Sequence, residues 1–272
     1  MLQIMIKIIN KIKFSKNQNR MKKVGDVQEA VNYFDSRKNK NLFFLIKNRY
    51  EWMNKFIKEN DIGIEVGSGA GLSKKFITNK NLKTSDFSDG QHLDYKNIDA
   101  QNTGFNENSY DFVIAANMVH HIPYPIKFFR EMHKILKKDG KLIIQEAYCS
   151  IAFQLITILM RHEGFDFTKD VWSETSSVTD DDDLWAGNIA VPHLVFDDLN
   201  IFNKHLGSYF KIEHESFSEC IIFLNSGGVC SRTFYIPMNN LLLKFFLKFD
   251  NFLTKYFPKI FSMGRRLVLR KI

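Results

Sequence analysis

The hydrophobic positions of this chain change their spacing near residue 60. Residues 27–58 place apolar side chains at helical intervals along one face, which predicts helical structure there. After that point short apolar runs are separated by polar turns, and this predicts strands rather than long helices. The predicted strands are 62–66, 82–86, 97–99, 110–115 and 141–146, and the predicted helices between them are 72–77 and 125–137. Alternating strands and helices favour an α/β fold in which helices cover both faces of a mostly parallel sheet.

Beyond residue 150 the pattern is looser. A helix is predicted at 151–160, a loop-rich region at 166–200, a strand at 211–217 and a terminal strand at 266–270. Between these strands, residues 239–261 form a Phe- and Leu-rich helical stretch with lysines between the apolar positions. Its apolar positions have helical spacing: Leu241, Phe245, Phe249, Phe252, Tyr256 and Ile260. This face predicts either a core helix or a helix lying on an anionic lipid surface.

Charge is distributed unevenly along the chain. The 272 residues carry a net charge of +8, with five basic side chains and no acid in residues 1–20. Residues 241–272 carry eight basic side chains and one acid, so the part between the two ends is mildly acidic. A nucleic-acid enzyme would more often place basic charge around its active-site face, and we therefore expect no nucleic-acid partner. The basic ends instead suggest peripheral contact with a membrane.

Composition indicates a folded protein of the cytoplasm. Hydrophobic residues make up 44% of the chain, which is enough for a core, and no uncharged apolar run reaches the roughly 18 residues of a spanning helix. The apolar start at 2–14 is interrupted by lysines and is not followed by a small-residue cleavage site, so a signal peptide is a poor fit. We expect a cytoplasmic location, with or without attachment to the inner membrane surface. The sequence leaves the start codon, Met1 or Met21, and the oligomeric state open.

The cysteines and acidic residues predict no metal site. Cys149, Cys220 and Cys230 lack metal or redox spacing and are expected to be reduced structural thiols. The aspartates of the run 180–183 point in different directions, which is typical of a solvated loop rather than a divalent-ion site.

The strongest chemical signal is a glycine-rich turn after the first predicted strand, with the sequence Glu65-Val66-Gly67-Ser68-Gly69-Ala70-Gly71. Glycines there permit positive φ and allow a ligand to approach the backbone closely. Asp86, 21 residues after Glu65 and at the end of the next strand, is placed to accept hydrogen bonds from ribose hydroxyls. A dinucleotide fingerprint would need glycine at position 72, which is Leu, and no Gly-Lys-Ser/Thr of a Walker loop follows. The turn therefore indicates a nucleoside cofactor of another kind.

Residues 62–147 resemble the class I S-adenosylmethionine-dependent methyltransferases, specifically the small-molecule group called methyltransferase type 11. The resemblance is carried by residues 64–71, Ser85-Asp86, Asp99-Ala100, 110–114, His120-His121-Ile122 and 131–142. It implies a Rossmann-like fold with a mostly parallel seven-stranded sheet and S-adenosyl-L-methionine as the cofactor. We expect three regions along the chain: a basic N-terminal extension at 1–26, a cofactor-binding core at 27–150, and acceptor-side insertions with the last strands at 151–272.

The resemblance also assigns cofactor-binding residues. By position Asp86 should hold the ribose, Asp99 should accept from the adenine amine beside the Ala100 backbone, and Asn117 should lie near the methionyl end. The full set of expected cofactor-binding residues is Glu65, Gly67, Ser68, Gly69, Gly71, Asp86, Asp99, Ala100 and Asn117. The family usually has Pro-Gly before the fifth strand, where this chain has Asp139-Gly140. Asp-Gly forms the turn as well.

His120 and His121 lie at the mouth of the fourth predicted strand, where an acceptor would approach. A histidine pair can hold a base near neutral pH, so we expect both to be catalytic; the alternative is that one of them packs against or caps the loop before Pro123. Glu146, Tyr148 and His193 are further candidates for contact with the acceptor, against the alternatives of loop anchoring and a surface loop.

The expected function is methyl transfer to a small or lipid-linked acceptor, a hydroxyl of a cell-surface glycan precursor. Part of the tail, 224–229 and 266–271, resembles methyltransferases encoded with surface-polysaccharide genes. The alternatives are a C-methyltransferase of quinone or lipid biosynthesis, with a Phe-lined acceptor cavity, and a cofactor-binding protein without catalysis. An RNA methyltransferase is disfavoured because the core is acidic.

Overall fold

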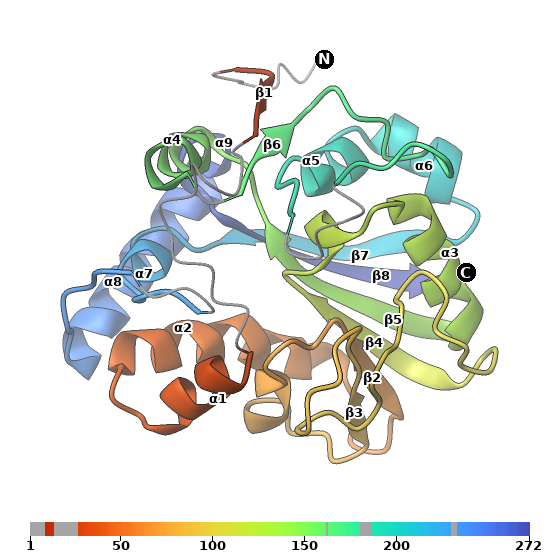
Figure 1. Ribbon diagram of the computed structural model, residues 1–272, viewed down its shortest axis with the longest axis horizontal. Coiled ribbons are helices and arrows are strands. Elements are labelled where there is room, and N and C mark those ends of the chain that lie inside the picture. Colours follow the sequence, from red (N-terminus) through yellow and green to blue (C-terminus); the bar gives the residue numbers. More distant parts are fainter. Residues whose placement is uncertain (1–8, 14–26, 162, 180–185, 230–232) are drawn as a thin grey trace.

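The computed structural model describes residues 9–13, 27–161, 163–179, 186–229 and 233–272 (Figure 1). Its centre is a sheet with the strand order β3-β2-β4-β5-β8-β7. The strands are β2 (Gly63–Val66), β3 (Leu82–Thr84), β4 (Tyr110–Ala116), β5 (Leu136–Ala147), β7 (Phe210–Ser218) and β8 (Gly264–Lys271). Neighbours among β3, β2, β4 and β5 pair in parallel, whereas β8 is antiparallel to both β5 and β7. This is the mostly parallel α/β sheet that the sequence predicts.

The central sheet has six strands within the described residues, one fewer than expected. The strand predicted at 97–99 is not formed there. Asp99 instead accepts a hydrogen bond from the Gln101 backbone N–H at 2.8 Å and makes an isolated bridge to Asn102. An aspartate that bonds to the backbone two residues ahead stabilises a turn at the expense of a strand ladder. The segment still lies beside β3, because the Ile98 N–H donates to the Asp86 carbonyl at 2.9 Å.

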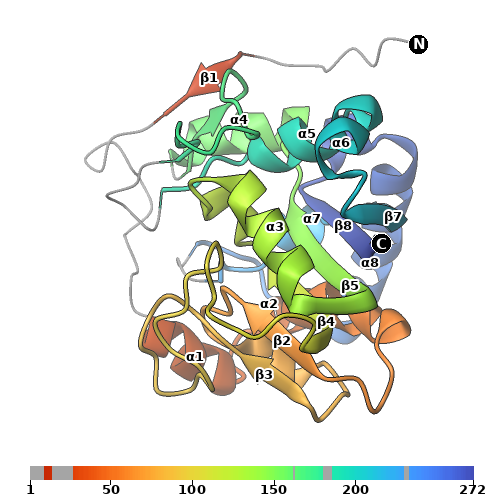
Figure 2. The same ribbon diagram turned by 90° about the vertical axis from the view of Figure 1, so that its right-hand side faces the viewer.

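Helices cover both faces of the sheet, and the strands alternate between two hydrophobic cores (Figures 1 and 2). Phe112 and Ile114 face the core formed with α1 (Val27–Asp35), α2 (Lys40–Glu51) and the 3₁₀ helix Trp52–Phe56. Val113 and Ala115 face the opposite core, formed with α3 (Pro125–Ile135), α5 (Val191–Phe196) and α6 (Leu199–Leu206). Because both faces are buried, the central strands are continuous apolar runs.

The region after β5 supplies the remaining elements. They are α4 (Ile151–Met160), β6 (Phe165–Asp166), α7 (Ile221–Leu224), α8 (Asn240–Tyr256) and α9 (Pro258–Phe261). The short β1 (Lys11–Ile12) pairs antiparallel with β6, so the described piece of the basic N-terminal extension is attached to this region. The loop-rich prediction for 166–200 missed α5 and the start of α6, whose short apolar runs give little periodic signal.

Helix α8 presents its apolar face outward, which makes the core-helix interpretation wrong. Its buried residues are Leu243, Asp250 and Thr254. The buried Asp250 carboxylate accepts hydrogen bonds from three backbone N–H groups at the start of α7, those of Cys220, Ile221 and Ile222, at 2.9–3.1 Å. The five apolar residues with helical spacing on α8 are all exposed, from 43% for Phe249 to 78% for Leu241, and the sixth, Ile260, falls in α9 and is 37% exposed. The polar contact made by Asp250 therefore decides which face of the helix docks.

Candidate active site

The glycine-rich turn leaves β2 in a left-handed conformation at three positions. Gly67, Gly69 and Gly71 have φ of +62°, +49° and +61°, which an L side chain rarely adopts. A Cβ at Gly67 would lie 2.9 Å from the Met118 Cβ, so Gly67 permits close packing against the segment after β4. A Cβ at Gly69 would have no atom of the described residues within 4 Å. Gly69 thus exposes its backbone to open space, as a turn that receives a ligand requires.

Two side chains hold Gly69 in place. The Asp86 Oδ2 atom accepts from the Gly69 N–H at 2.8 Å, and the His92 Nε2 atom lies 2.7 Å from the Gly69 carbonyl oxygen. Asp86 follows β3, and its other oxygen accepts from the Ser88 N–H at 2.9 Å. The carboxylate is half-buried and each oxygen retains a second lone pair. Asp86 is therefore positioned by the loop and can still accept from a ligand hydroxyl. His92 was not anticipated, and no motif in the sequence marks it.

Glu65 lies beneath the turn and is fully buried. Its carboxylate accepts from the Ser73 hydroxyl at 2.5 Å and from the Tyr50 hydroxyl at 3.1 Å. Burial raises the pKa of Glu65 to about 7, even though these hydrogen bonds act to lower it. Ser68 is also tied to the turn, because its hydroxyl donates to the Glu65 carbonyl at 3.1 Å and its N–H donates to the Ser85 carbonyl at 3.0 Å. Both side chains shape the loop from inside the protein.

The other expected cofactor residues lie at the same sheet edge, because parallel strands end there together. Asn117, directly after β4, has φ of +53° and donates its N–H to the Gln145 carbonyl at 2.7 Å. Asp99 and the buried Ala100 follow Ile98, which is hydrogen-bonded to the Asp86 backbone. The structure therefore brings the turn, Asp86, Asp99 and Asn117 to one edge, as the sequence predicts.

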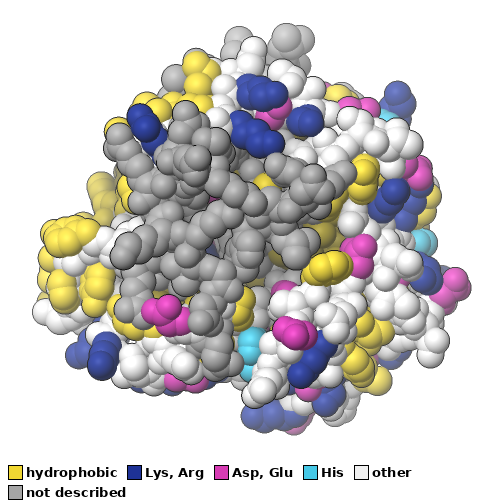
Figure 3. Space-filling model, viewed as in Figure 1, with side chains coloured by type: hydrophobic (Ala, Val, Ile, Leu, Met, Phe, Trp, Pro, Cys, Tyr) yellow, Lys and Arg dark blue, Asp and Glu magenta, His cyan; other side chains and the backbone are white. Residues whose placement is uncertain are grey.

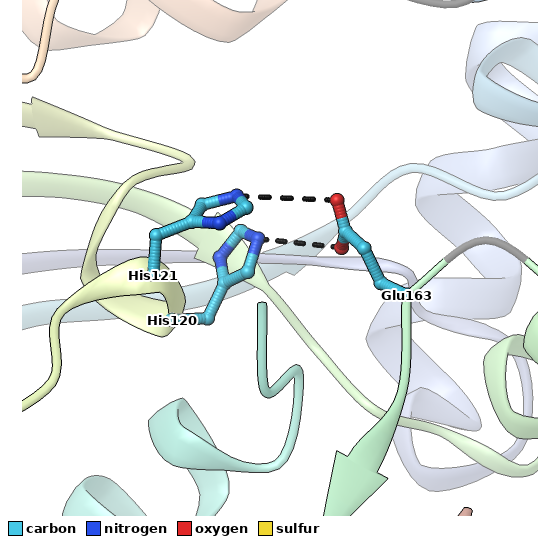
Figure 4. Close-up of side chains that lie close together, drawn as sticks. All are labelled: His120, His121 and Glu163. Atoms are coloured by element: carbon cyan, nitrogen blue, oxygen red, sulfur yellow. Dashed lines mark ion pairs between the residues drawn. The ribbon is translucent and has the colours of Figure 1, made fainter. Parts of the chain in front are cut away.

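The histidine pair lies in the 3₁₀ helix Val119–His121, which begins after Met118, the residue that packs against Gly67. His120 is buried, and its Nδ1 atom is 2.5 Å from the Glu146 Oε1 atom. Its Nε2 atom is 3.4 Å from Oε2 of Glu163, and the His121 Nε2 atom is 3.9 Å from Oε1 of Glu163 (Figure 4). Glu163 lies just before β6 and completes a cluster that sequence reasoning missed.

The electrostatics of His120 correct one expectation. Burial acts to lower the pKa of His120, but the carboxylates of Glu146 and Glu163 raise it to about 10. Burial acts to raise the pKa of Glu146, and the charge of His120 lowers it below the usual range. His120 is thus an imidazolium at neutral pH in this arrangement, and it is not a base poised near neutrality. His121 is half-exposed and lies beside it, with ring centroids 4.2 Å apart.

The remaining candidates lie inside the protein or outside the described residues. Tyr148 and His193 are buried and stacked on each other with ring centroids 4.2 Å apart, and the His193 Nε2 atom is 3.6 Å from Oδ2 of Asp197. They form packing contacts beneath the sheet edge. Cys149 and Cys220 are buried free thiols, as expected. The aspartate run at 180–183 and Cys230 lie outside the described residues. Among the described helices, we find none with the length and apolar character needed to cross a bilayer.

Comparisons with known proteins bear on the sheet edge that carries the glycine-rich turn, Asp86, Asp99 and Asn117, which we call the cofactor edge. Residues 64–144 match the methyltransferase type 11 family model, described as a methyltransferase domain. Probable polyketide synthase 10 of Dictyostelium discoideum is 29% identical over 108 residues, covering 37% of this chain and 4% of that protein. Highly reducing polyketide synthase gloL of Glarea lozoyensis is 37% identical over 71 residues, covering 25% of this chain and 3% of that protein. The chain therefore spans only a few per cent of the length of these curated relatives.

A solved structure shows the fold. The crystal structure of an S-adenosylmethionine-dependent methyltransferase from Archaeoglobus fulgidus is similar with a TM-score of 0.51 at 13% identity. The similarity covers 89% of this chain and 99% of that one. The expected Rossmann-like class I methyltransferase fold is thereby confirmed.

Proposed function

We propose that this chain, which carries an S-adenosylmethionine-dependent methyltransferase domain, transfers the methyl group to a hydroxyl of a small or lipid-linked acceptor, a cell-surface glycan precursor. The observation that carries the proposal is the cluster of His120, His121 and Glu163 beside the cofactor edge. A hydroxyl must lose its proton as the methyl arrives, and imidazole and carboxylate groups assist that step. Methylation of an electron-rich carbon has less need of such groups.

The residues at the sheet edge fit S-adenosylmethionine. The open space at Gly69 admits the ligand close to the backbone, and the half-buried carboxylate of Asp86 suits a ribose diol. In this proposal Asp99 and Ala100 hold the adenine, Asn117 lies by the methionyl group, and Glu65 supports the turn without touching the ligand. The backbone of the turn contributes the remaining contacts, at Gly67, Ser68, Gly69 and Gly71.

The cofactor supplies an activated methyl group on a sulfonium, so the protein must align the acceptor and manage one proton. In the transfer the sulfur–carbon bond breaks as the oxygen–carbon bond forms, and the hydroxyl proton leaves. Because His120 is already protonated, we assign the acceptance of that proton to the other two members of the cluster, the Glu163 carboxylate and the His121 imidazole, which His120 holds in place. His120 is held rigidly by Glu146, so the cluster has one fixed imidazolium and one half-exposed histidine ring facing the same carboxylate.

A lipid-linked acceptor is supported by the outward face of α8. Phe245 and Phe249 are 61% and 43% exposed, and hydrophobic side chains gather at the left edge of Figure 3, where Figure 1 shows α8. Every charged side chain that α8 exposes is a lysine, because its one acid, Asp250, is buried. An apolar face flanked by cationic side chains fits an anionic lipid surface. We propose that α8 rests on such a surface while the cofactor edge reaches the acceptor.

Vesicle co-sedimentation tests the lipid contact. The full chain should bind vesicles containing phosphatidylglycerol more strongly than vesicles of phosphatidylcholine alone, and Phe245→Ser/Phe249→Ser should lose most of that binding. Leu199→Ser, on α6 and 54% exposed, is the matched control and should bind like the wild type. Equal binding by the double variant would remove the proposal. Dimerisation without lipid that the double variant abolishes would instead assign the face to a second copy of the chain.

Transfer of a labelled methyl group tests the reaction. The purified chain is incubated with methyl-tritiated S-adenosylmethionine and with soluble and lipid-extracted fractions of cells that lack the gene. We expect a labelled product in the lipid-extracted fraction whose methyl group is linked through oxygen, and no product with Asp86→Ala. A methyl group on a quinone ring carbon would favour C-methylation. Cofactor binding without product in any fraction would favour a non-catalytic protein.

A further inference from the structure

The cluster of His120, His121 and Glu163 has the geometry of a divalent-metal site. One nitrogen of each imidazole and one oxygen of the carboxylate all lie within 4.8 Å of one another. The Nε2 atoms of His120 and His121 lie 3.4 and 3.9 Å from the nearest carboxylate oxygens of Glu163. Ligands about 2.0–2.2 Å from a tetrahedral zinc ion lie roughly 3.3–3.6 Å from each other. The two rings point at opposite oxygens of the carboxylate (Figure 4), so small side-chain shifts would bring all three groups around one ion.

The surroundings of His120 favour a metal ligand over a simple ion pair. Its Nδ1 atom faces Glu146, whose carboxylate is fixed by the N–H groups of Val119 and Ala147 at 2.8 Å each. A carboxylate that accepts from one ring nitrogen directs the other nitrogen toward a metal and raises its basicity. The Nε2 atom of His120 is thereby aimed at Glu163 and has little freedom to turn away.

Gly187 closes the site from the other side. A Cβ at this position would lie 2.9 Å from Cδ2 of His120, 3.2 Å from Cε1 of His121 and 3.4 Å from Cδ of Glu163. The backbone nearby is also attached to the cluster, because the Asn188 N–H donates to the His120 carbonyl at 2.8 Å. The insertion therefore packs against all three side chains at a residue that has no side chain of its own.

We propose that His120, His121 and Glu163 bind one divalent transition-metal ion, zinc by preference, through the two Nε2 atoms and the carboxylate. Two imidazoles with one carboxylate form the ligand set of many catalytic zinc sites, which keep further positions open for water or substrate. On binding, the ion takes the place of the proton between His120 and Glu163, and that proton leaves to solvent. The sequence predicts no metal here because two ligands are adjacent and the third lies more than forty residues away, so no ligand spacing is visible.

The ion would also take part in activating the acceptor hydroxyl, and this extension of the proposal rests on the proposed function. A hydroxyl oxygen bound at an open position of the ion would lose its proton more easily, because a Lewis acid lowers the pKa of a bound hydroxyl. With its proton passed to water, that oxygen would be the nucleophile toward the methyl carbon. Metal binding itself does not depend on this extension and can be measured alone.

The test is zinc binding by the full chain, stripped of metal and titrated with Zn²⁺ against a chromogenic chelator. We expect one tight site per chain. Glu163→Gln should weaken binding more than roughly 100-fold, since it removes a ligand, and Glu146→Gln should weaken it roughly 10–100-fold, since it removes the group that orients His120. The matched control is His205→Asn, which removes a histidine that stacks on Trp172 outside the cluster and should bind zinc like the wild type.

A second measurement distinguishes loss of metal binding from loss of the folded state. Co²⁺ in place of zinc should give visible absorption bands that change in His121→Asn and in Gly187→Ala, while binding of S-adenosylhomocysteine reports that each variant is folded. Zinc affinity in Glu163→Gln equal to that of the wild type would overturn the proposal, as would the absence of a tight site in a wild type that binds S-adenosylhomocysteine. Zinc binding without methyl transfer would leave the metal site standing and count against the proposed function.

Discussion

Substitution by alanine at two glycines of the turn should have different main effects, on stability at Gly67 and on ligand binding at Gly69. In Gly67→Ala the new methyl group would meet the Met118 Cβ at 2.9 Å, an atom that cannot move without its backbone. The positive φ costs about 1–2 kcal/mol and the overpacking about 1–3 kcal/mol, so we expect a loss of about 2–5 kcal/mol in the free energy of unfolding. In Gly69→Ala the methyl group meets no atom in the part of the chain that the structure describes, and only the cost of about 1–2 kcal/mol for positive φ applies.

The affinity for ligand, unlike the stability, should depend mainly on Gly69. The open space at Gly69 is where we place the cofactor, so Gly69→Ala should weaken binding of S-adenosylhomocysteine by about tenfold or more while the protein stays folded, corresponding to at least about 1.4 kcal/mol. Urea denaturation measures the first quantity and titration calorimetry the second. Unchanged affinity in a folded Gly69→Ala would refute the placement of the ligand. A Gly67→Ala variant as stable as Gly69→Ala would refute the role assigned to the Met118 contact.

Three further substitutions probe buried polar groups. Glu65 is protonated in the folded state up to a pKa of about 7, so wild-type stability should fall as pH rises from about 4.5 to 7, and pH-dependent denaturation of Glu65→Gln should show a shallower slope. His120→Ala leaves the Glu146 charge buried without its partner and should cost about 3–5 kcal/mol in urea denaturation. The difference in free energy of unfolding between the wild type and His120→Ala should be fully present below pH 6.5. It should be lost as the pH rises through about 10, the raised pKa of His120. Asp250→Ala deprives three N–H groups of their acceptor and should cost about 1–3 kcal/mol, with hydrogen exchange rising first in α7 and α8.

The cofactor edge could be predicted because its signals are local. Glycines in a turn after a strand need only the backbone conformation of that turn, and Gly67, Gly69 and Gly71 all have the expected positive φ. Asp86 could be placed because a parallel sheet aligns the carboxyl ends of its strands. The segment at 97–99 was mispredicted as a strand, because the Asp99 side chain stabilises a turn that competes with extended pairing.

The orientation of α8 and the third member of the cluster could not be predicted, because both depend on distant contacts. The helical spacing of Phe245 and Phe249 correctly predicts a helix. The hydrogen bonds from α7 to Asp250 determine which face of that helix is buried. Likewise Glu163 meets His120 only because the insertion folds back over the sheet edge. The pKa of His120 is raised by Glu146 and Glu163, and the sequence does not show that these two carboxylates lie beside it. A base near neutral pH was therefore the wrong expectation for His120.

The measurement that tests the central claim most directly is calorimetric titration of S-adenosylhomocysteine into the wild type, Asp86→Ala and Asp89→Ala. Asp86 should contribute charge-assisted hydrogen bonds to the ribose worth about 1.5–3 kcal/mol, so its removal should weaken binding roughly 10–150-fold. Asp89, exposed and three residues further along the same loop, is the matched control and should leave the affinity unchanged. One binding site in the wild type that is weakened in Asp86→Ala alone is the result we predict. A folded Asp86→Ala that binds like the wild type, or a wild type that does not bind, would contradict the assignment of this turn as the cofactor site.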